Sequence, residues 1–266
     1  MDRSHLPKGL EAVAAHVPLI IEACVDTVQS AIAAQQGGAD RIELCDNLMD
    51  GGTTPSHGML GVTLEQVTIP VFPIIRLRGG AFTYDAGEIE VMRRDVKHAR
   101  WLGAQGVVIG ALTPDGDIDQ AAVHTLQESA KDLPVTFHRA FDVCRNAAEA
   151  LETLIRLGVQ RVLTSGRRNT AWEGRETIAA IRRQAEGRIV VLAGGGIDET
   201  NAAEIVRDTG VGELHVRGTM PFRETVTFHA DPVSFRRPAA PDDELRFVTD
   251  PIRIGAIRSA AAKGME

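Results

Sequence analysis

Eight short apolar runs, rich in β-branched residues, recur along the chain and alternate with segments of helical length. They begin near residues 18, 40, 71, 106, 135, 161, 189 and 213, a spacing of about 28 residues. Runs such as VFPIIRLR and IVVLAGGG are too continuously apolar to have a solvated face, which is typical of parallel strands covered by helices. Repeated βαβ units form either an open sheet or a closed barrel. The count of eight, and the lack of a nucleotide-binding glycine fingerprint after the first run, predict an α/β fold with a single (β/α)₈ TIM barrel.

Two segments lie outside this alternation. Residues 1–17 are interpreted as a short N-terminal extension, and residues 18–266 as the barrel domain. Residues 219–249 contain four prolines and have no clean periodicity, while the segment from Pro251 onward again has a helical pattern. We therefore expect a long insertion before the last helix.

Charge and composition exclude several classes of protein. The chain carries 36 acidic and 29 basic residues, a net charge of -7, so it lacks the basic surface that nucleic-acid binding requires. Its apolar stretches are shorter than the roughly 20 residues of a membrane span, and the first residues do not resemble a secretory signal. Three cysteines, an odd count, favour reduced thiols over a disulfide framework. We therefore expect a cytoplasmic protein that binds neither nucleic acid nor membrane.

Polar residues occur near the carboxyl ends of the first two predicted strands, where barrel enzymes carry their chemistry. The twofold alternation of a strand places Glu22 and Cys24 on one face, and it directs Glu43 and Cys45 toward the barrel interior. If the carboxylates of Glu22 and Glu43 lie close together, they need a neighbouring cation, which Arg76 on the third strand could supply. The other possibility is that one of the two carboxyl groups stays protonated. The alternative interpretation is a structural layer of ion pairs closing the barrel.

The other strand ends add further candidates. The same alternation directs Arg76, and by extension Arg78, inward from the third strand, and it selects His138 or Arg139 on the fifth and His215 on the eighth. We interpret the acids and bases at these strand ends as candidate catalytic residues; they are Glu22, Glu43, Arg76 and His138.

The cysteines indicate a different chemistry. Cys24 and Cys45 occupy equivalent places, two residues beyond Glu22 and Glu43, so adjacent strands would hold their sulfurs close together. Thiolates at that separation suit Cu(I) or zinc. No CxxC motif or His/Cys cluster accompanies them, and buried cysteines often only pack, so inert packing is the alternative.

A glycine-rich turn follows the seventh strand. Gly194, Gly195 and Gly196 precede a predicted helix near Asp198, and such turns bind phosphate in many barrels. The alternative is a tight turn that only glycine can make, and a carboxylate at the helix start can occupy the free N–H donors. Together with Arg78, His215 and Arg217, these glycines form the predicted substrate-binding set.

Five motifs of this chain resemble the CutC family of copper homeostasis proteins, which are (β/α)₈ barrels. They read ELCDNLMDGGTTPSHG, FPIIRLRGGAFTYD, VTFHRAFDVC, RVLTSG and AGGGI, in order between residues 18 and 218. The resemblance implies a cytoplasmic, dimeric barrel whose mouth carries Glu22, Glu43, Arg76 and His138, with metal thiols at Cys24 and Cys45. The extension at residues 1–17 and the loop HVRGTMPFRE depart from the family pattern.

Two functions follow from these observations. The first is a cytoplasmic copper homeostasis protein that binds Cu(I) through Cys24 and Cys45. The alternative is an enzyme of unknown reaction that acts on a small anionic, including phosphorylated, metabolite through the glutamates, Arg76 and His138. A copper carrier needs only the thiols, whereas an enzyme needs the carboxylates, arginine and histidine.

Overall fold

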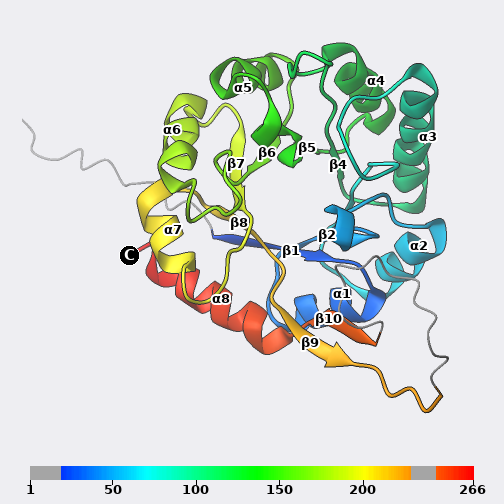
Figure 1. Ribbon diagram of the computed structural model, residues 1–266, viewed down its shortest axis with the longest axis vertical. Coiled ribbons are helices and arrows are strands. Elements are labelled where there is room, and N and C mark those ends of the chain that lie inside the picture. Colours follow the sequence, from blue (N-terminus) through cyan, green and yellow to red (C-terminus); the bar gives the residue numbers. More distant parts are fainter. Residues whose placement is uncertain (1–18, 229–243) are drawn as a thin grey trace, which may run out of the picture.

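A computed structural model describes residues 19–228 and 244–266. The predicted N-terminal extension, residues 1–17, lies outside the described residues, as does the middle of the predicted insertion. The described residues form a barrel of strands inside a ring of helices (Figure 1).

Eight parallel strands form the barrel, in the order β3-β2-β1-β8-β7-β6-β5-β4. They are β1 (Ile20–Val25), β2 (Arg41–Leu44), β3 (Val71–Pro73), β4 (Val107–Ile109), β5 (Val135–Phe137), β6 (Arg161–Thr164), β7 (Val190–Gly194) and β8 (Glu213–Val216). A parallel bridge between Ile74 and Val108 joins the two ends of the sheet, so the barrel closes. The prediction of a (β/α)₈ barrel is confirmed, with every strand starting close to its predicted residue.

Eight helices surround the strands. They are α1 (Val28–Gln36), α2 (His57–Gln66), α3 (Ala86–Leu102), α4 (Gln120–Ala130), α5 (Ala147–Arg156), α6 (Arg175–Ala185), α7 (Ala202–Thr209) and α8 (Pro251–Lys263). Most begin at a side chain that accepts a hydrogen bond from the first turn, such as Asp85, which forms a capping box with Glu88, and Asn146 before α5. Two short 3₁₀ helices, η1 (Leu48–Asp50) and η2 (Arg139–Val143), follow β2 and β5.

Side-chain alternation separates an outer core from the barrel interior. Ile21 and Ile42 are fully buried in the large core between strands and helices. The sulfurs of Cys24 and Cys45 belong instead to a small cluster with Phe72 inside the barrel. Residues two apart on one strand therefore share the interior, as the sequence alternation predicts.

The register between β1 and β2 differs from the expected one. Glu22 is paired with Arg41, and Cys24 is paired with Glu43, so the two cysteines do not lie at the same height. Closing a barrel requires each strand to be displaced along its neighbour, and this displacement is the reason for the shift. The prediction that Cys24 and Cys45 occupy equivalent heights is wrong.

The predicted insertion begins and ends as an antiparallel hairpin. Strand β9 (Thr219–Arg223) pairs with β10 (Leu245–Thr249) at the edge of the barrel, where β10 packs on α1 (Figure 1). The sequence did not predict this hairpin, because side chains on both faces of β9 are exposed and leave no alternating pattern. In the described ranges, none of the helices has the length and apolarity to span a membrane.

Candidate functional site

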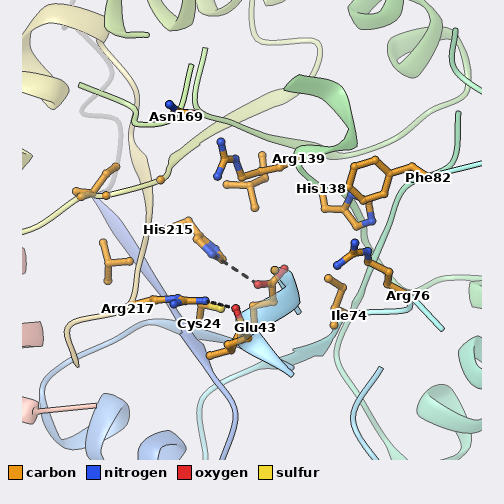
Figure 2. Close-up of a pocket in the computed structure, with 17 residues that line it drawn as sticks. Cys24, Glu43, Ile74, Arg76, Phe82, His138, Arg139, Asn169, His215 and Arg217 are labelled. Carbon is orange, nitrogen blue, oxygen red and sulfur yellow. Dashed lines mark hydrogen bonds and ion pairs between the residues drawn. The ribbon is translucent and has the colours of Figure 1, made fainter. Parts of the chain in front are cut away.

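A pocket of about 410 Å³ opens at the carboxyl ends of the barrel strands (Figure 2). Its polar lining comes from seven strand ends and the loops that follow them: Cys24, Glu43, Arg76, His138, Arg139, Asn169, Gly195, Gly196, His215 and Arg217. Apolar side chains, among them Ile74, Phe82 and Leu163, complete the wall. This mixture of apolar walls and a few polar groups is typical of a small-molecule site.

A candidate metal cluster lies on one side of this pocket. The ligand atoms of Cys24, Glu43 and Cys45 all lie within 4.8 Å of one another. The two sulfurs are 3.8 Å apart, and the Cys45 sulfur is 3.5 Å from Oε2 of Glu43. Cys24 and Glu43 face the pocket, whereas Cys45 lies beneath the Gly52 turn. Two soft sulfurs beside one carboxylate form a donor set that fits Cu(I).

The cysteines differ in protonation. The hydrogen bond with Cys45 and the charge of His215 lower the pKa of the Cys24 thiol well below its usual value, against the effect of burial. The same contact with Cys24, together with burial, raises the pKa of the Cys45 thiol. The contact therefore favours deprotonation of Cys24 over Cys45, and a thiolate is the form that binds a metal ion.

Glu43 and Glu22 also differ in protonation. Burial, the largest cause, raises the pKa of Glu43 to about 8. Burial alone would raise the pKa of Glu22 as well, but the hydrogen bond with His215 and the charge of Arg41 lower it to about 2. The carboxylates around His215 outweigh its burial and raise its pKa well above the usual value. Neighbouring carboxyls with separated pKa values are the arrangement that acid–base catalysis uses.

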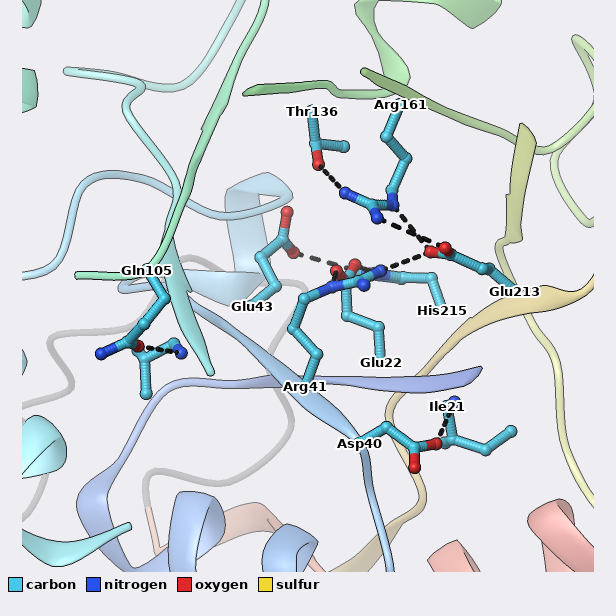
Figure 3. Close-up of polar contacts among 11 residues, drawn as sticks. Ile21, Glu22, Asp40, Arg41, Glu43, Gln105, Thr136, Arg161, Glu213 and His215 are labelled. Carbon is cyan, nitrogen blue, oxygen red and sulfur yellow. Dashed lines mark hydrogen bonds and ion pairs between the residues drawn. The ribbon is translucent and has the colours of Figure 1, made fainter. Parts of the chain in front are cut away.

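A layer of ion pairs lies below the pocket (Figure 3). Arg41 Nε donates to Glu22 Oε2 at 2.5 Å, and its Nη2 donates to Glu213 Oε2 at 2.6 Å. Arg161 Nε donates to the same Glu213 oxygen at 2.6 Å. His215 joins this layer to the pocket, since its Nδ1 is 2.8 Å from Glu22 and its Nε2 is 3.6 Å from Glu43.

This layer corrects two expectations. Arg41, not Arg76, is the cation that neutralises Glu22, because the barrel displacement brings Arg41 directly opposite Glu22. Glu22 does not line the pocket; it is fully buried one layer deeper. For Glu22 the structure therefore matches the alternative of a structural ion-pair layer, while Glu43 faces the pocket.

Arg76 and His138 lie together on the other side of the pocket from Cys24 and Arg217 (Figure 2). Arg76 donates to the backbone carbonyls of Asp50, Gly52 and Gly80, and its guanidinium stacks 5.0 Å from the Phe82 ring. His138 Nδ1 accepts a hydrogen bond from the backbone N–H of Ala140.

The predicted substrate-binding residues are only partly brought together. Gly195, Gly196, His215 and Arg217 line the pocket, but Arg78 and Gly194 do not. Arg78 instead pairs with Glu88 at the start of α3. Gly194 is needed for space, because a Cβ there would lie 2.6 Å from Leu163 and 3.0 Å from His215.

Asp198 accepts the N–H groups of the turn that leads into α7 and that of Ala202, the first residue of the helix. Asp198 accepts from Thr200 through its carboxylate and from Asn201 and Ala202 through its backbone carbonyl. The predicted binding of phosphate by this helix start therefore has less support, while the neighbouring turn at Gly195 and Gly196 faces the pocket.

Sequence reasoning missed three functional or supporting side chains. Asn169 lines the pocket from the loop after β6, and no short motif marks it. Asp142 accepts hydrogen bonds from Arg139 and from the backbone of Ser165, and it thereby holds the β6 loop against the pocket. Glu213, at the start of β8, shares Arg41 with Glu22. The charged residue in an otherwise apolar strand was the available signal for Glu213.

The imidazole of His138 should stay neutral between about pH 5 and pH 8. Burial, the largest cause, and the charge of Arg76 lower its pKa from 6.5 to about 3. An unfolded chain takes up a proton here as the pH falls below 6.5, while the folded chain does not. The stabilisation from the neutral ring is complete above that pH and is lost toward pH 3, at up to about 1.4 kcal/mol per pH unit. NMR titration of the His138 ring checks this, and a midpoint near 6.5 would contradict it.

Comparison with known proteins places this chain in a family. The model of the CutC family matches residues 19–220. The chain belongs to the CutC family. The human copper homeostasis protein cutC homolog is 51% identical over 80% of this chain and 77% of its own length, and the mouse homolog is 44% identical over 91% and 89%.

Solved structures agree with this assignment. The crystal structure of the copper homeostasis protein CutC from Streptococcus agalactiae is 34% identical, covers 74% of this chain and 97% of its own, and has a TM-score of 0.71. The phosphoribosylanthranilate isomerase of Pyrococcus furiosus is only 13% identical at a TM-score of 0.56 and shares the barrel fold alone. The resemblance to the CutC family seen in the sequence is therefore confirmed.

Proposed function

We propose that this protein acts in copper homeostasis by binding one Cu(I) ion through Cys24 and Cys45. The observation that carries the proposal is the 3.8 Å separation of the two sulfurs, with Glu43 within 4.8 Å of both. A thiolate at Cys24 supplies the first soft ligand, and deprotonation of Cys45 on binding supplies the second. Relatives at 44–51% identity bear the name copper homeostasis protein.

The test is an anaerobic Cu(I) titration against a competing chelator. We expect one Cu(I) per chain in the parent protein. Loss of an outer-shell partner alone weakens metal binding by about 10–100-fold, so Cys24→Ser and Cys45→Ser should each weaken it by more than about 100-fold. Cys144→Ser is the matched control, because Cys144 is also a buried free thiol but does not belong to the cluster. Equal copper binding by the Cys24→Ser, Cys45→Ser double variant would refute the proposal.

We place this function in the cytoplasm and in a homodimer. The three described cysteines are free thiols, and a reducing compartment would keep Cys24 and Cys45 available for metal. The homodimer follows from the family resemblance. Light scattering after size exclusion should give twice the mass of one chain, and the mass of a single chain would contradict the dimer.

A second candidate function is an enzyme acting on a small anionic metabolite. The observation that favours it is the buried Glu43 carboxyl in the pocket, 3.6 Å from His215, whose pKa is raised to about 8 by burial; a copper carrier does not require such a group. Glu43 could then exchange a proton with carbon or oxygen of a bound substrate. Incubation in D₂O with small carboxylates and phosphate esters, followed by proton NMR, should show exchange in the parent protein and none in Glu43→Gln. Absence of exchange in both proteins would remove this candidate for those substrates.

A further inference from the structure

Arg76 is a buried cation without a carboxylate partner among the described residues. Arg76 is 4% exposed, yet its guanidinium forms no ion pair with any described residue. It donates to three backbone carbonyls and lies near the Tyr84 hydroxyl, and its Nε is buried with no hydrogen-bond partner in the described structure. Carbonyl oxygens satisfy donors but do not neutralise a charge, and buried charges in proteins are normally paired. The position therefore requires an anion that these residues do not supply.

His138 presents a second unpartnered donor on the same wall of the pocket. Its Nδ1 accepts from Ala140 N–H at 3.1 Å, so the proton of the neutral ring is on Nε2. His138 is 4% exposed, and its buried Nε2 has no hydrogen-bond partner in the described part of the chain. An unsatisfied buried donor is unfavourable, and such groups in native structures call for an explanation. A ligand acceptor beside Arg76 and His138 explains both orphaned donors at once.

The rest of the pocket suits an organic anion. Two more arginines, Arg139 and Arg217, line it, although the chain as a whole has a net charge of -7. Arg217 has no ion-pair partner among the described residues and donates only to the carbonyl of Leu48. The volume of about 410 Å³ and the apolar walls of Ile74 and Phe82 fit a small molecule rather than a lone inorganic ion.

We propose that the barrel mouth binds a small organic anion whose carboxylate or phosphoryl group accepts hydrogen bonds from Arg76 and His138. The remainder of the molecule lies against the apolar walls and extends toward Arg217. This inference does not rest on copper binding, because neither Arg76 nor His138 belongs to the Cys24, Glu43 and Cys45 cluster. It assigns the side of the pocket that carries Arg76 and His138 to ligand recognition.

The experiment uses the full chain, reduced and metal-free, with inorganic phosphate and acetate as separate probes at constant ionic strength. Isothermal titration should give a dissociation constant on the order of 1 mM for at least one probe, since each offers few atoms. Arg76→Met should weaken that binding by about 10–100-fold, because it removes charge-assisted hydrogen bonds. Arg145→Gln is the matched control: Arg145 is an exposed arginine in the loops at the same end of the barrel, outside this pocket, and its loss should leave the affinity unchanged.

NMR of the parent protein keeps the test independent of how well Arg76→Met folds. The Nε2 resonance of His138 should shift on addition of the bound probe and should not shift with chloride. Stronger binding of phosphate assigns a phosphoryl ligand, and stronger binding of acetate assigns a carboxylate. The proposal is overturned if neither probe moves the His138 resonance, or if a folded Arg76→Met binds the probe as tightly as the parent protein.

Discussion

Replacing Arg41 by methionine should lower the free energy of unfolding by about 3–5 kcal/mol. Arg41 is buried and donates to Glu22 at 2.5 Å and to Glu213 at 2.6 Å. Methionine fills much of the same volume but leaves the fully buried Glu22 carboxylate without its arginine. Glu22 keeps His215 at 2.8 Å, but loss of the arginine leaves the buried charge only partly compensated, which is far less favourable than loss of a surface pair.

Urea unfolding followed by circular dichroism measures this change. Arg188→Met is the matched control, because Arg188 pairs with Glu152 at 2.8 Å while 42% exposed, and its loss should change stability by less than about 1 kcal/mol. Adding Glu22→Gln to Arg41→Met should recover part of the loss, since the buried charge that has lost its arginine is removed. A loss below about 1 kcal/mol in Arg41→Met would show that the ion-pair layer does not support the barrel.

The sequence predicted the barrel because its signal is local. Strands such as β7, IVVLAGGG in the sequence, are recognised from a few consecutive residues, and the helices between them from their caps, such as Asn146. Alternation within a strand also predicted that Glu43 and Cys45 face the interior. These properties depend only on neighbours along the chain.

The partners inside the barrel could not be predicted in the same way. Whether Glu22 meets Arg41 or Arg76 depends on the displacement between strands, which is a property of the closed barrel and not of either strand. A similar limit applies to Asp142, whose partners lie 22–25 residues away on the β6 loop. The members of the candidate site were therefore predicted from the sequence. The separation of the ion-pair layer from the pocket above it, and of Arg76 and His138 from Cys24 within the pocket, was not.

The layers are coupled through His215. Arg41 helps to keep Glu22 ionised, Glu22 lies 2.8 Å from His215, and His215 lies 3.6 Å from Glu43 at the pocket floor. The charge on His215 in turn favours the Cys24 thiolate. An ion-pair layer that stabilises the fold thereby also sets the protonation of the candidate metal ligands. Variants of Arg41 should consequently be assessed for folding before any change in copper binding is interpreted.

Removal of the Asp142 carboxylate should have an effect of similar size. Asp142 Oδ1 accepts from Thr164 Oγ1 at 2.5 Å and from the backbone N–H of Arg167 at 3.1 Å, and Oδ2 accepts from Ser165 Oγ and Arg139 Nε at 2.8 Å. Asp142→Ala leaves the Thr164 hydroxyl, the Arg167 N–H and Arg139 Nε without this acceptor, each at a cost of about 1–3 kcal/mol where no water replaces it, while the Ser165 hydroxyl keeps the Arg168 carbonyl. We expect a total loss of about 3–5 kcal/mol.

Urea unfolding of Asp142→Ala, Asp142→Asn and Asp117→Ala separates the causes of this loss. Asparagine retains one acceptor oxygen, so Asp142→Asn should lose less stability than Asp142→Ala. Asp117 also pairs with an arginine, Arg145 at 2.7 Å, but it is 44% exposed, and its replacement should change stability by less than about 1 kcal/mol. Asp142 also anchors Arg139, whose Nη1 lies beside Gly195, so the backbone amide resonance of Gly195 should shift in Asp142→Ala and stay in place in Asp117→Ala. Equal stability of the two alanine variants would mean that water satisfies the β6 loop and that Asp142 does not position the pocket wall.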